Sequence, residues 1–345
     1  MRYVIMKQRG KIITGGLRSL GRELQKEAWQ DAGYVILVDE NTFQFCLPAL
    51  VSQVEPFQEA EFVEVPVGEE CKSLEVASQI WQTLMERVSD RNTVIVNLGG
   101  GCVCDLGGFV AAGFKRGIRH INIPTTLLAM VDASIGGKTA VNFGDVKNMI
   151  GHFYMPEAVC IDTTFLATLP QSELLSGKVE MIKTAAVADP ALYRQLLQSA
   201  DITKQQIVAV AKLKNRIVKE DFNDHGIRQI LNFGHTFGHA VEAYSHLSHG
   251  EAVGVGMLMA MYLSTKKIGL DVEIYQSYKA WATSHLKLPA YTLKDVPNLL
   301  YLIHQDKKSE SGRARCVLLR QVGAAMIGVE VPDEEIVDAI LSLGR

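Results

Sequence analysis

The sequence predicts two domains: an N-terminal α/β domain built on a parallel sheet, and a C-terminal domain that is mainly α-helical. Up to Asp162, short apolar runs alternate with stretches of helical periodicity. From Thr163 onward the pattern is mostly helical, with breaks at Pro190, at 221–226 and at 245–250. A length of 345 residues is typical of about two domains. We therefore divide the chain into residues 1–162 and 163–345.

Four strands and one helix are expected in the first domain. The strands are 33–38, which a loop at 39–41 follows, and then 60–65, 92–97 and 121–123. Apolar residues at helical spacing predict a helix over 73–88. Near the end of the chain, a polar loop at 305–315 precedes a further strand at 316–319. Ligands of a parallel sheet covered by helices bind outside the carboxyl ends of its strands, so a site is expected there.

The composition is that of an ordinary globular protein. Hydrophobic residues make up 48% of the chain, and charges of both signs are interspersed with a net charge of −3, so no nucleic-acid-binding face is predicted. Six cysteines show no disulfide framework, which favours free thiols in a reducing cytosol. The N-terminus turns polar too soon for a signal peptide, and no apolar run approaches the ~18 residues that a membrane span needs. We expect a cytoplasmic protein without a membrane partner.

Four histidines fall between residues 232 and 251. His235 and His239 lie one helical turn apart. His249 begins another helical run, after a short polar link whose His246 we interpret as a solvated loop residue. Two imidazoles from adjacent helices and an acid from elsewhere would form a three-ligand site with an open position, which is the form of a catalytic Zn²⁺ site. The alternative is that these histidines are core or capping residues.

A glycine-rich segment at 98–108 follows a predicted strand and opens a helix. Its glycines allow the backbone to approach a ligand closely, and free N–H groups at a helix start can bind phosphate. Cys104 occupies the third glycine position of the dinucleotide-binding fingerprint, so the segment departs from that motif. The segment indicates nucleotide binding, with a tight turn that needs small residues as the alternative.

A second candidate for binding an anion lies at 124–139. Asp132 ends an apolar run, and a pair of glycines then precedes Lys138, as suits an anionic ligand. The segment ends like a P-loop but lacks the first P-loop glycine, because Asp132 stands there. Lys147 and Asn148 follow soon after. The alternative is a solvated loop of charged residues.

Two predicted helices carry further polar candidates. One begins near Pro170 and has Glu180 and Lys183 on one face. These two residues form either an exposed ion pair or, with Glu180 as an oxygen ligand, part of the metal site. Lys214 lies within the apolar stripe of a later helix, where lysine usually extends along the surface to solvent but can also point its ammonium into a cleft.

Taken together, these motifs resemble the 3-dehydroquinate synthase family. Their order is Gly-Gly-Gly-x-x-x-Asp, Arg-Gly, Pro-Thr-Thr-Leu-Leu-Ala, Val-Asp-x-Ser-x-Gly-Gly-Lys-Thr, Lys-Asn, Thr-Leu-Pro, Glu-x-x-Lys, Leu-Asn-Phe-Gly-His-Thr-x-Gly-His and His-Gly-Glu. The resemblance covers nearly the whole chain, and the joint spacing is highly specific. It implies a Rossmann-like N-terminal domain that holds NAD, a helical C-terminal domain that holds Zn²⁺ or Co²⁺, and an active site between them.

The resemblance also implies roles for individual residues. The metal ligands would be Glu180, His235 and His249. The substrate pocket would be lined by Asp132, Lys138, Asn148, Lys183, Lys214, Arg228, Asn232, His239 and one of Lys307 and Lys308, with Lys308 as our assignment. The cofactor would contact Asp39, Asn41, Glu69, Lys72, Gly100, Gly101, Asp105, Thr125, Thr126, Lys138, Lys147, Thr168 and Glu173. Arg116 would reach the substrate phosphate of the neighbouring subunit in a homodimer.

The reaction implied is a carbon–oxygen lyase step of the shikimate pathway, from 3-deoxy-D-arabino-heptulosonate 7-phosphate to 3-dehydroquinate and phosphate. It proceeds by transient NAD-dependent oxidation, phosphate elimination, reduction and intramolecular aldol cyclisation. The alternatives are another sugar phosphate cyclase, of the valiolone or inosose type, and a metal-dependent polyol dehydrogenase. Arg228 favours the first interpretation, because it would pair with a substrate carboxylate that a neutral sugar lacks.

Some positions depart from the family pattern. Phe222 stands where the family often has an acid, and the run Phe143-Gly-Asp145 replaces a common His-Pro. Val179 and Thr184 replace the usual alanine and tyrosine beside Glu180 and Lys183. All of these positions lie next to the implied ligands and leave the ligands themselves intact.

Overall fold

The computed structural model describes residues 10–87, 89–144, 146–306 and 313–344. Its contacts divide it into two compact units. Unit 1 comprises Met1–Pro170 and Ile207–Asn223, and unit 2 comprises Gln171–Gln206 and Asp224–Arg345, each within the described residues. The two predicted domains with a boundary near Asp162 stay a prediction. The first break between the two units follows Pro170, which is close to that boundary. The later segment 207–223 also belongs to unit 1.

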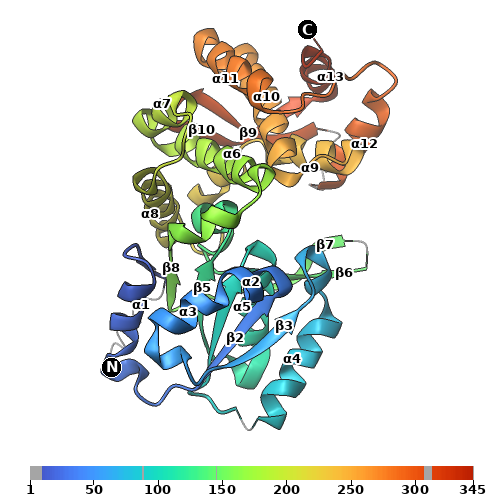
Figure 1. The fold of residues 1–345 in the computed structure, drawn as a ribbon. Coiled ribbons are helices and arrows are strands. Elements are labelled where there is room, and N and C mark those ends of the chain that lie inside the picture. Colours follow the sequence, from blue (N-terminus) through green and yellow to red (C-terminus); the bar gives the residue numbers. More distant parts are fainter. Residues whose placement is uncertain (1–9, 88, 145, 307–312, 345) are drawn as a thin grey trace, which may run out of the picture. The chain divides into compact units, whose positions relative to one another are not determined.

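Unit 1 is built on the parallel sheet that its apolar runs predicted (Figure 1). The chain runs from β2 outward to β3 and then returns to the other side of β2 to form β4. The carboxyl ends of β2 and β4 therefore lie at a topological switch point, where such sheets bind ligands. The strand order is β1 (Lys11–Ile13), β8 (Ala158–Cys160), β5 (Arg119–Pro124), β4 (Val94–Gly99), β2 (Tyr34–Asp39) and β3 (Glu61–Val65).

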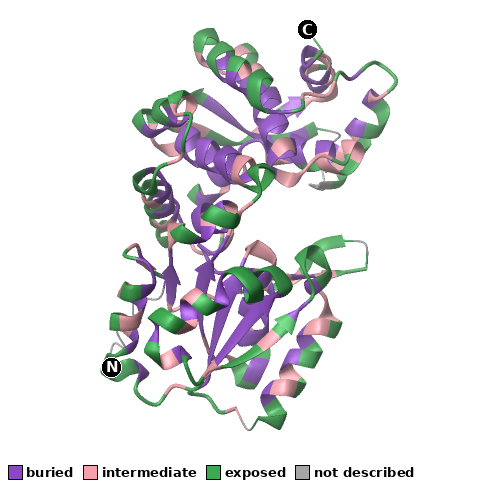
Figure 2. Ribbon diagram, viewed as in Figure 1, coloured by how far each residue is buried: buried purple, intermediate pink, exposed green. Residues whose placement is uncertain are grey.

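The central strands are buried on both faces, which explains why they read as continuous apolar runs (Figure 2). Helices α4 (Leu74–Glu86) and α5 (Gly101–Gly113) pack against them through one cluster, which includes Leu37, Ile80 and Ile95. The other helical segments of unit 1 are α1 (Leu17–Leu24), η1 (Glu27–Trp29), α3 (Leu47–Gln53), η2 (Glu55–Phe57), η3 (Gly68–Cys71), η4 (Phe114–Arg116), η5 (Ala129–Ala133), η6 (Thr163–Thr168) and most of α8 (Lys204–Glu220).

The expectation of a loop after β2 was wrong. Helix α2 (Glu40–Phe45) starts at once, because Asp39 closes a capping box with Thr42. The Asp39 carboxylate accepts from the Thr42 N–H at 2.8 Å, and the Thr42 hydroxyl accepts from the Asp39 N–H at 2.9 Å. Asp39 thus stands where a buried strand turns directly into a helix.

Lys138 and Lys147 lie on an antiparallel hairpin and not in the solvated loop that was the alternative to an anion-binding segment. The hairpin consists of β6 (Lys138–Phe143) and β7 (Val146–Phe153). Gly137 has a φ of 66°, and a Cβ there would lie 3.0 Å from the backbone of Met155, so this position requires glycine. Phe222, which replaces an acid of the family pattern, packs edge-on against Phe153 with ring centroids 5.7 Å apart. Asp145 lies outside the described residues.

Unit 2 is mainly helical and is organised around α10 (His249–Lys267), most of whose residues are buried (Figure 2). Helix α10 contacts α6 (Gln171–Ala188), α9 (His235–Ser245), α11 (Val272–His285), α13 (Asp333–Ser342) and strand β9 (Arg313–Gln321). The predicted strand at 316–319 lies within β9, which pairs antiparallel with β10 (Ala324–Pro332). The unit also contains α7 (Pro190–Gln198), η7 (Ile227–Asn232) and α12 (Val296–Asp306).

The close packing of α9 on α10 predicts a large cost for adding one methyl group. A Cβ on Gly256 would lie 2.1 Å from the carbonyl oxygen of Gly234 and 2.5 Å from the N of Gly238. Because backbone atoms cannot yield as a side chain does, we expect Gly256→Ala to destabilise the protein by about 3 kcal/mol. The measurement is a urea unfolding curve, with Gly33→Ala as the control, since a Cβ at Gly33 meets nothing within 4 Å.

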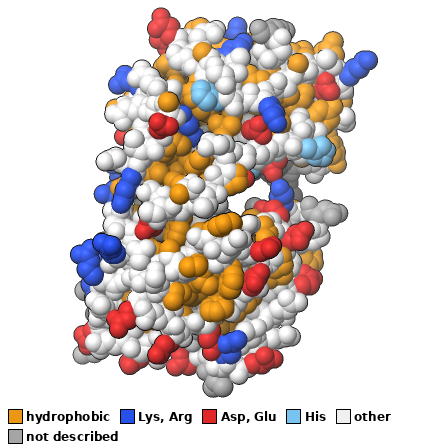
Figure 3. All heavy atoms as spheres, viewed as in Figure 1, with side chains coloured by type: hydrophobic (Ala, Val, Ile, Leu, Met, Phe, Trp, Pro, Cys, Tyr) orange, Lys and Arg blue, Asp and Glu red, His pale blue; other side chains and the backbone are white. Residues whose placement is uncertain are grey.

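Two observations concern the surface and the membrane. Acidic and basic side chains are both scattered over the face shown in Figure 3. Among the described helices, none combines the length and the apolar character that crossing a membrane requires.

Candidate metal centre and cofactor-binding residues

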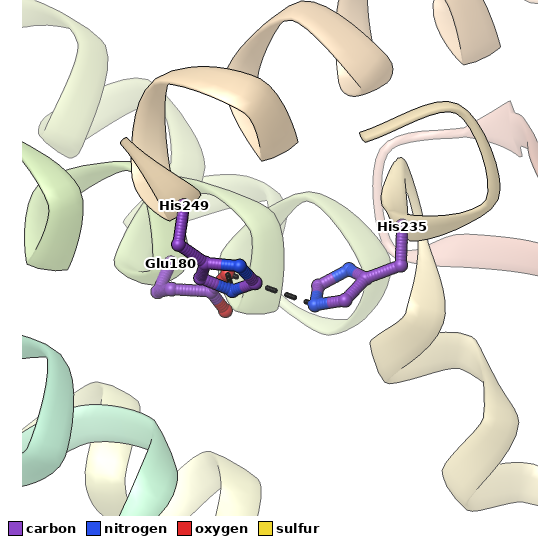
Figure 4. Close-up of side chains that lie close together, drawn as sticks. All are labelled: Glu180, His235 and His249. Atoms are coloured by element: carbon purple, nitrogen blue, oxygen red, sulfur yellow. Dashed lines mark ion pairs between the residues drawn. The ribbon is translucent and has the colours of Figure 1, made fainter. Parts of the chain in front are cut away.

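Three side chains of unit 2 converge at the starts of two helices and the middle of a third (Figure 4). His235 and His249 are the first residues of α9 and α10, and Glu180 lies within α6. One potential ligand atom from each residue lies within 4.8 Å of the others. The Nε2 atoms of both histidines are 3.9 Å from Oε1 of Glu180. The structure therefore brings together the three residues that were predicted as metal ligands.

The sequence around each helix start explains how the histidines are placed. Gly234 precedes α9 with a φ of 80°, and a Cβ there would lie 2.8 Å from the N of Met257. Ser248 and Glu251 form a capping box at the start of α10, so His249 follows the cap directly. Glu251 of the His-Gly-Glu run thus caps a helix and is not among the three clustered side chains.

The carboxylate of Glu180 fits a cation. Its side chain is 1% exposed, and neither oxygen accepts a hydrogen bond from the described residues, although the buried ammonium of Lys183 forms an ion pair with Oε2. Lys183 accounts for Oε2 alone, so the buried Oε1 lacks a hydrogen bond, which is costly unless a cation lies beside it. Ligand atoms of a tetrahedral Zn²⁺ site lie about 3.4 Å apart. The observed 3.9 Å is slightly wider, and one oxygen with two imidazole nitrogens suits Zn²⁺ or Co²⁺.

Of two interpretations made from the sequence, one is wrong and the other is confirmed. Glu180 and Lys183 are 1% and 2% exposed, which excludes an exposed ion pair. His246 is exposed and lies in the link after α9, as expected of a solvated loop residue, and with a φ of 52° it also caps that helix in the left-handed conformation.

The other predicted substrate residues of unit 2 that the structure describes lie on α9 and on η7, the segment that precedes it. The ring of His239 is 5.3 Å from that of His235 and 6.3 Å from that of His249, between centroids. Arg228 is buried in η7, and Asn232 ends that segment. Of the remaining predictions, Glu173 lies in the first turn of α6, and Lys307 and Lys308 lie outside the described residues.

In unit 1, Lys72 joins several predicted cofactor and substrate residues. Its ammonium donates to Asp105 at 2.8 Å and to the side-chain oxygen of Asn148. Asn142 donates to Glu69 at 2.9 Å and accepts from the N–H of Asn148 at 2.8 Å. Burial lowers the pKa of Lys72, but Asp105 and Glu69 outweigh this effect and leave the pKa above its ordinary value. Asn148, with a φ of 56°, is thus held by its neighbours in a left-handed conformation.

The usual behaviour of a lysine on an apolar stripe, extension along the surface to solvent, is not what Lys214 shows. It is 6% exposed, and its ammonium donates to the Asp132 carboxylate at 2.6 Å and to the Asp132 carbonyl at 2.7 Å. Asp132 belongs to the π-helical turn η5, a form that is frequent at functional sites.

The glycine-rich turn is both tight and placed at the switch point. Helix α5 starts at Gly101, directly after β4 and its cap Gly100. A Cβ on Gly100 would lie 3.1 Å from the Thr126 side chain, and the Thr125 N–H donates to Gly99 at 3.0 Å. The first N–H groups of α5 therefore lie at the end of β4, beside the end of β2.

The remaining predicted residues of unit 1 are Asn41, Lys147, Thr168 and Arg116. Asn41 and Lys147 are exposed on α2 and β7, and Thr168 ends η6. Arg116 is also exposed. It is the second of three successive residues with positive φ, at 47°, 67° and 110°. Such backbone strain gathers at functional positions.

The sequence interpretation missed two residues. Asn142 links Glu69 to Asn148, as described above. Glu242 lies 2.9 Å from Nδ1 of His249, and burial lowers the pKa of His249 but Glu242 and Glu180 more than offset this and raise it. In the sequence, the only sign that Glu242 belongs to the site is its position two turns after His235 on the same helix.

The chain is similar to known proteins over most of its length. Family models described as 3-dehydroquinate synthase N-terminal and C-terminal match residues 62–176 and 177–309. A 3-dehydroquinate synthase of Parabacteroides distasonis is 39% identical over 316 residues, which cover 88% of this chain and 89% of the relative.

Two solved structures share the fold. A 2-deoxy-scyllo-inosose synthase complexed with carbaglucose-6-phosphate, NAD⁺ and Co²⁺ has a TM-score of 0.80 at 23% identity and covers 96% of each chain. A 2-epi-5-epi-valiolone synthase of Streptomyces hygroscopicus with NAD⁺ and Zn²⁺ bound has a TM-score of 0.77 at 25% identity, covering 90% of this chain and 91% of its own.

Proposed function

The chain belongs to the 3-dehydroquinate synthase family, and from that premise we propose its reaction and the roles of its residues. It converts 3-deoxy-D-arabino-heptulosonate 7-phosphate into 3-dehydroquinate and phosphate, as an NAD- and metal-dependent carbon–oxygen lyase. The single observation that carries the proposal is the buried carboxylate of Glu180: Lys183 pairs with its Oε2, whereas its Oε1 accepts no hydrogen bond within the described chain and lies 3.9 Å from Nε2 of both His235 and His249.

We assign the two bound groups to different units. Glu180, His235 and His249 would hold a divalent cation, and the start of α5 with Asp39, Thr125 and the residues around Lys72 would hold NAD. When bound, the cation supplies Lewis acidity at the substrate hydroxyls, and NAD supplies the transient oxidation and reduction of one carbinol. The two cyclases of similar fold contain NAD⁺ and Co²⁺ or Zn²⁺, which supports this assignment.

The chain's own residues bind a substrate that carries both a carboxylate and a phosphate. We assign the carboxylate to Arg228, whose burial makes a charge-assisted pair strong. We assign the phosphate to Lys138, Asn148, His239 and Arg116. Phosphate leaves by β-elimination: the C6–H bond breaks, a C6–C7 double bond forms, the C7–O bond breaks, and a phosphate oxygen accepts the proton. Lys183 and Lys214 stabilise oxyanions that develop on the sugar.

A focused set of cations is needed here, because the protein as a whole carries a net charge of −3 and would repel an anionic substrate. In the structure Lys214 is paired with Asp132, and Lys183 with Glu180. These pairs hold the two buried ammonium groups in place before substrate arrives. When substrate binds, the ammonium of Lys214 would interact with the substrate in addition to Asp132.

We also propose a homodimer in the cytoplasm, in which Arg116 reaches the phosphate of the neighbouring subunit. The family resemblance supports the sharing of Arg116. Its exposed side chain and the strained backbone at 115–117 support a role that the subunit's own fold does not require.

The test is an assay of phosphate release with metal and NAD⁺ each added or omitted. We expect stoichiometric phosphate from the heptulonate phosphate, dependence on both additions, and no accumulation of NADH, because the oxidation is reversed in each turnover. A heptulose 7-phosphate, which lacks the carboxylate, should react about 10- to 100-fold more slowly, since Arg228 loses a charge-assisted partner. Faster turnover of the heptulose phosphate would instead indicate a valiolone-type cyclase, and steady NADH accumulation a polyol dehydrogenase.

A further inference from the structure

The imidazole of His249 contacts two acids through its two nitrogen atoms. Its Nε2 lies 3.9 Å from Oε1 of Glu180, on the side of the metal centre. Its Nδ1 lies 2.9 Å from Oε2 of Glu242, on the opposite side of the ring. Glu242 is on α9, the helix that begins at His235, so one helix carries both a predicted metal ligand and the partner of another.

We propose that Glu242 is a positioning residue of the metal centre, which sets the tautomer and orientation of His249 and raises the affinity for a divalent cation. The inference rests on the proposed function only in that Glu180, His235 and His249 hold the ion. An ionised carboxylate has no proton to donate, so the contact at Nδ1 requires an N–H there. The Nε2 lone pair is then left facing Glu180, where the ion would lie.

His235 has a weaker version of the same arrangement. Its Nδ1 faces the backbone carbonyl of Phe233 at 3.4 Å, and its Nε2 also faces Glu180. Its side chain is 16% exposed, whereas that of His249 is 41% exposed. A half-exposed ring has more freedom to rotate, so His249 depends more on a strong partner at Nδ1. The carboxylate of Glu242 provides that partner.

Charge gives a second reason for a carboxylate at this place. Glu180 is the only anionic member of the clustered ligands, and the ammonium of Lys183 is paired with it. These two charges cancel, so the ligand set alone attracts a dication weakly. Glu242 adds one negative charge beside His249, and its side chain is only 21% exposed, which limits screening by solvent.

The test measures metal binding by the substrate-free protein, so it does not depend on activity. The Zn²⁺ dissociation constant is obtained by competition with a chromophoric chelator, and the visible spectrum of the Co²⁺-loaded protein reports the coordination geometry. We expect Glu242→Ala to weaken binding about 10- to 100-fold and to change the Co²⁺ spectrum. Glu242→Gln keeps an acceptor for Nδ1 but removes the charge, and should weaken binding by about 10-fold.

The matched control is Tyr244→Phe. It removes the 2.7 Å hydrogen bond from Tyr244 to Asp295, on the same end of α9, without touching His249. It should leave the Zn²⁺ affinity unchanged if Glu242 acts through His249 rather than by securing the helix. Unchanged affinity in both Glu242 variants, or an equal loss in Tyr244→Phe, would overturn the inference and leave the proposed function intact. Absence of Zn²⁺ binding by the unaltered protein would instead contradict the metal centre itself.

Discussion

Replacement of His235 by alanine is expected to abolish specific Zn²⁺ binding and to lower the rate of phosphate release at least about 10³-fold, since Lewis-acid stabilisation by a metal is worth several kcal/mol. The reason is geometric. Only three side chains of the described chain cluster as possible ligands, and His235 is one of two that place Nε2 3.9 Å from Glu180. Two remaining ligands cannot enclose an ion, and Glu180 would keep only its ion pair with Lys183.

The measurement combines metal content after gel filtration with the phosphate assay. His246→Gly is the matched control, because His246 belongs to the same histidine-rich stretch but caps α9 with a φ of 52°, a conformation that glycine adopts freely. It should retain metal and activity. Full activity of His235→Ala with metal still bound would refute the assignment of the centre.

Replacement of Arg116 by alanine is expected to cause a comparable loss of activity, and mixing with His235→Ala should restore part of it. If each active site takes Arg116 from the partner subunit, a mixed dimer contains one site with an intact Arg116 and an intact His235. Random exchange between equal amounts then regenerates about one quarter of all sites, by the statistics of a two-fold dimer. If Arg116 served its own subunit, every site in the mixed dimer would carry one defect, and no activity would return.

The control for this experiment is Arg116→Ala mixed with a chain that carries both substitutions. No combination of those two chains contains Arg116, so activity should stay at the level of the single variants. Subunit exchange is verified independently with differently tagged chains by native mass spectrometry. Verified exchange without recovery of activity would exclude a shared site.

Much of the fold could be predicted because buried residues recur along the sequence with the period of a helix or a strand. Strands β2 and β4 are buried on both faces, so they appear in the sequence as mainly apolar runs, which only Asn97 in β4 and the terminal Asp39 of β2 depart from. Helix α4 appeared from its spacing of apolar residues, with Ser73 as its cap. The hairpin β6–β7 was missed because most of β7 is exposed and has no apolar alternation to show it. The start of α2 was missed because Asp39 is both the last residue of β2 and the N-cap of α2, so no loop separates the strand from the helix.

By itself, the sequence determined which residues could serve as ligands: His235 and His249 at the starts of two helices, Glu180 on a third, and a glycine-rich turn after a strand. Tertiary structure alone decided how they are used. It buried Glu180 beside Lys183, paired Lys214 with Asp132, and placed Glu242 against the far side of His249. The physical reason is range. Helix and strand periods report contacts within a few residues, whereas the burial and pairing of a charge depend on elements that are distant in the chain and meet only when it folds.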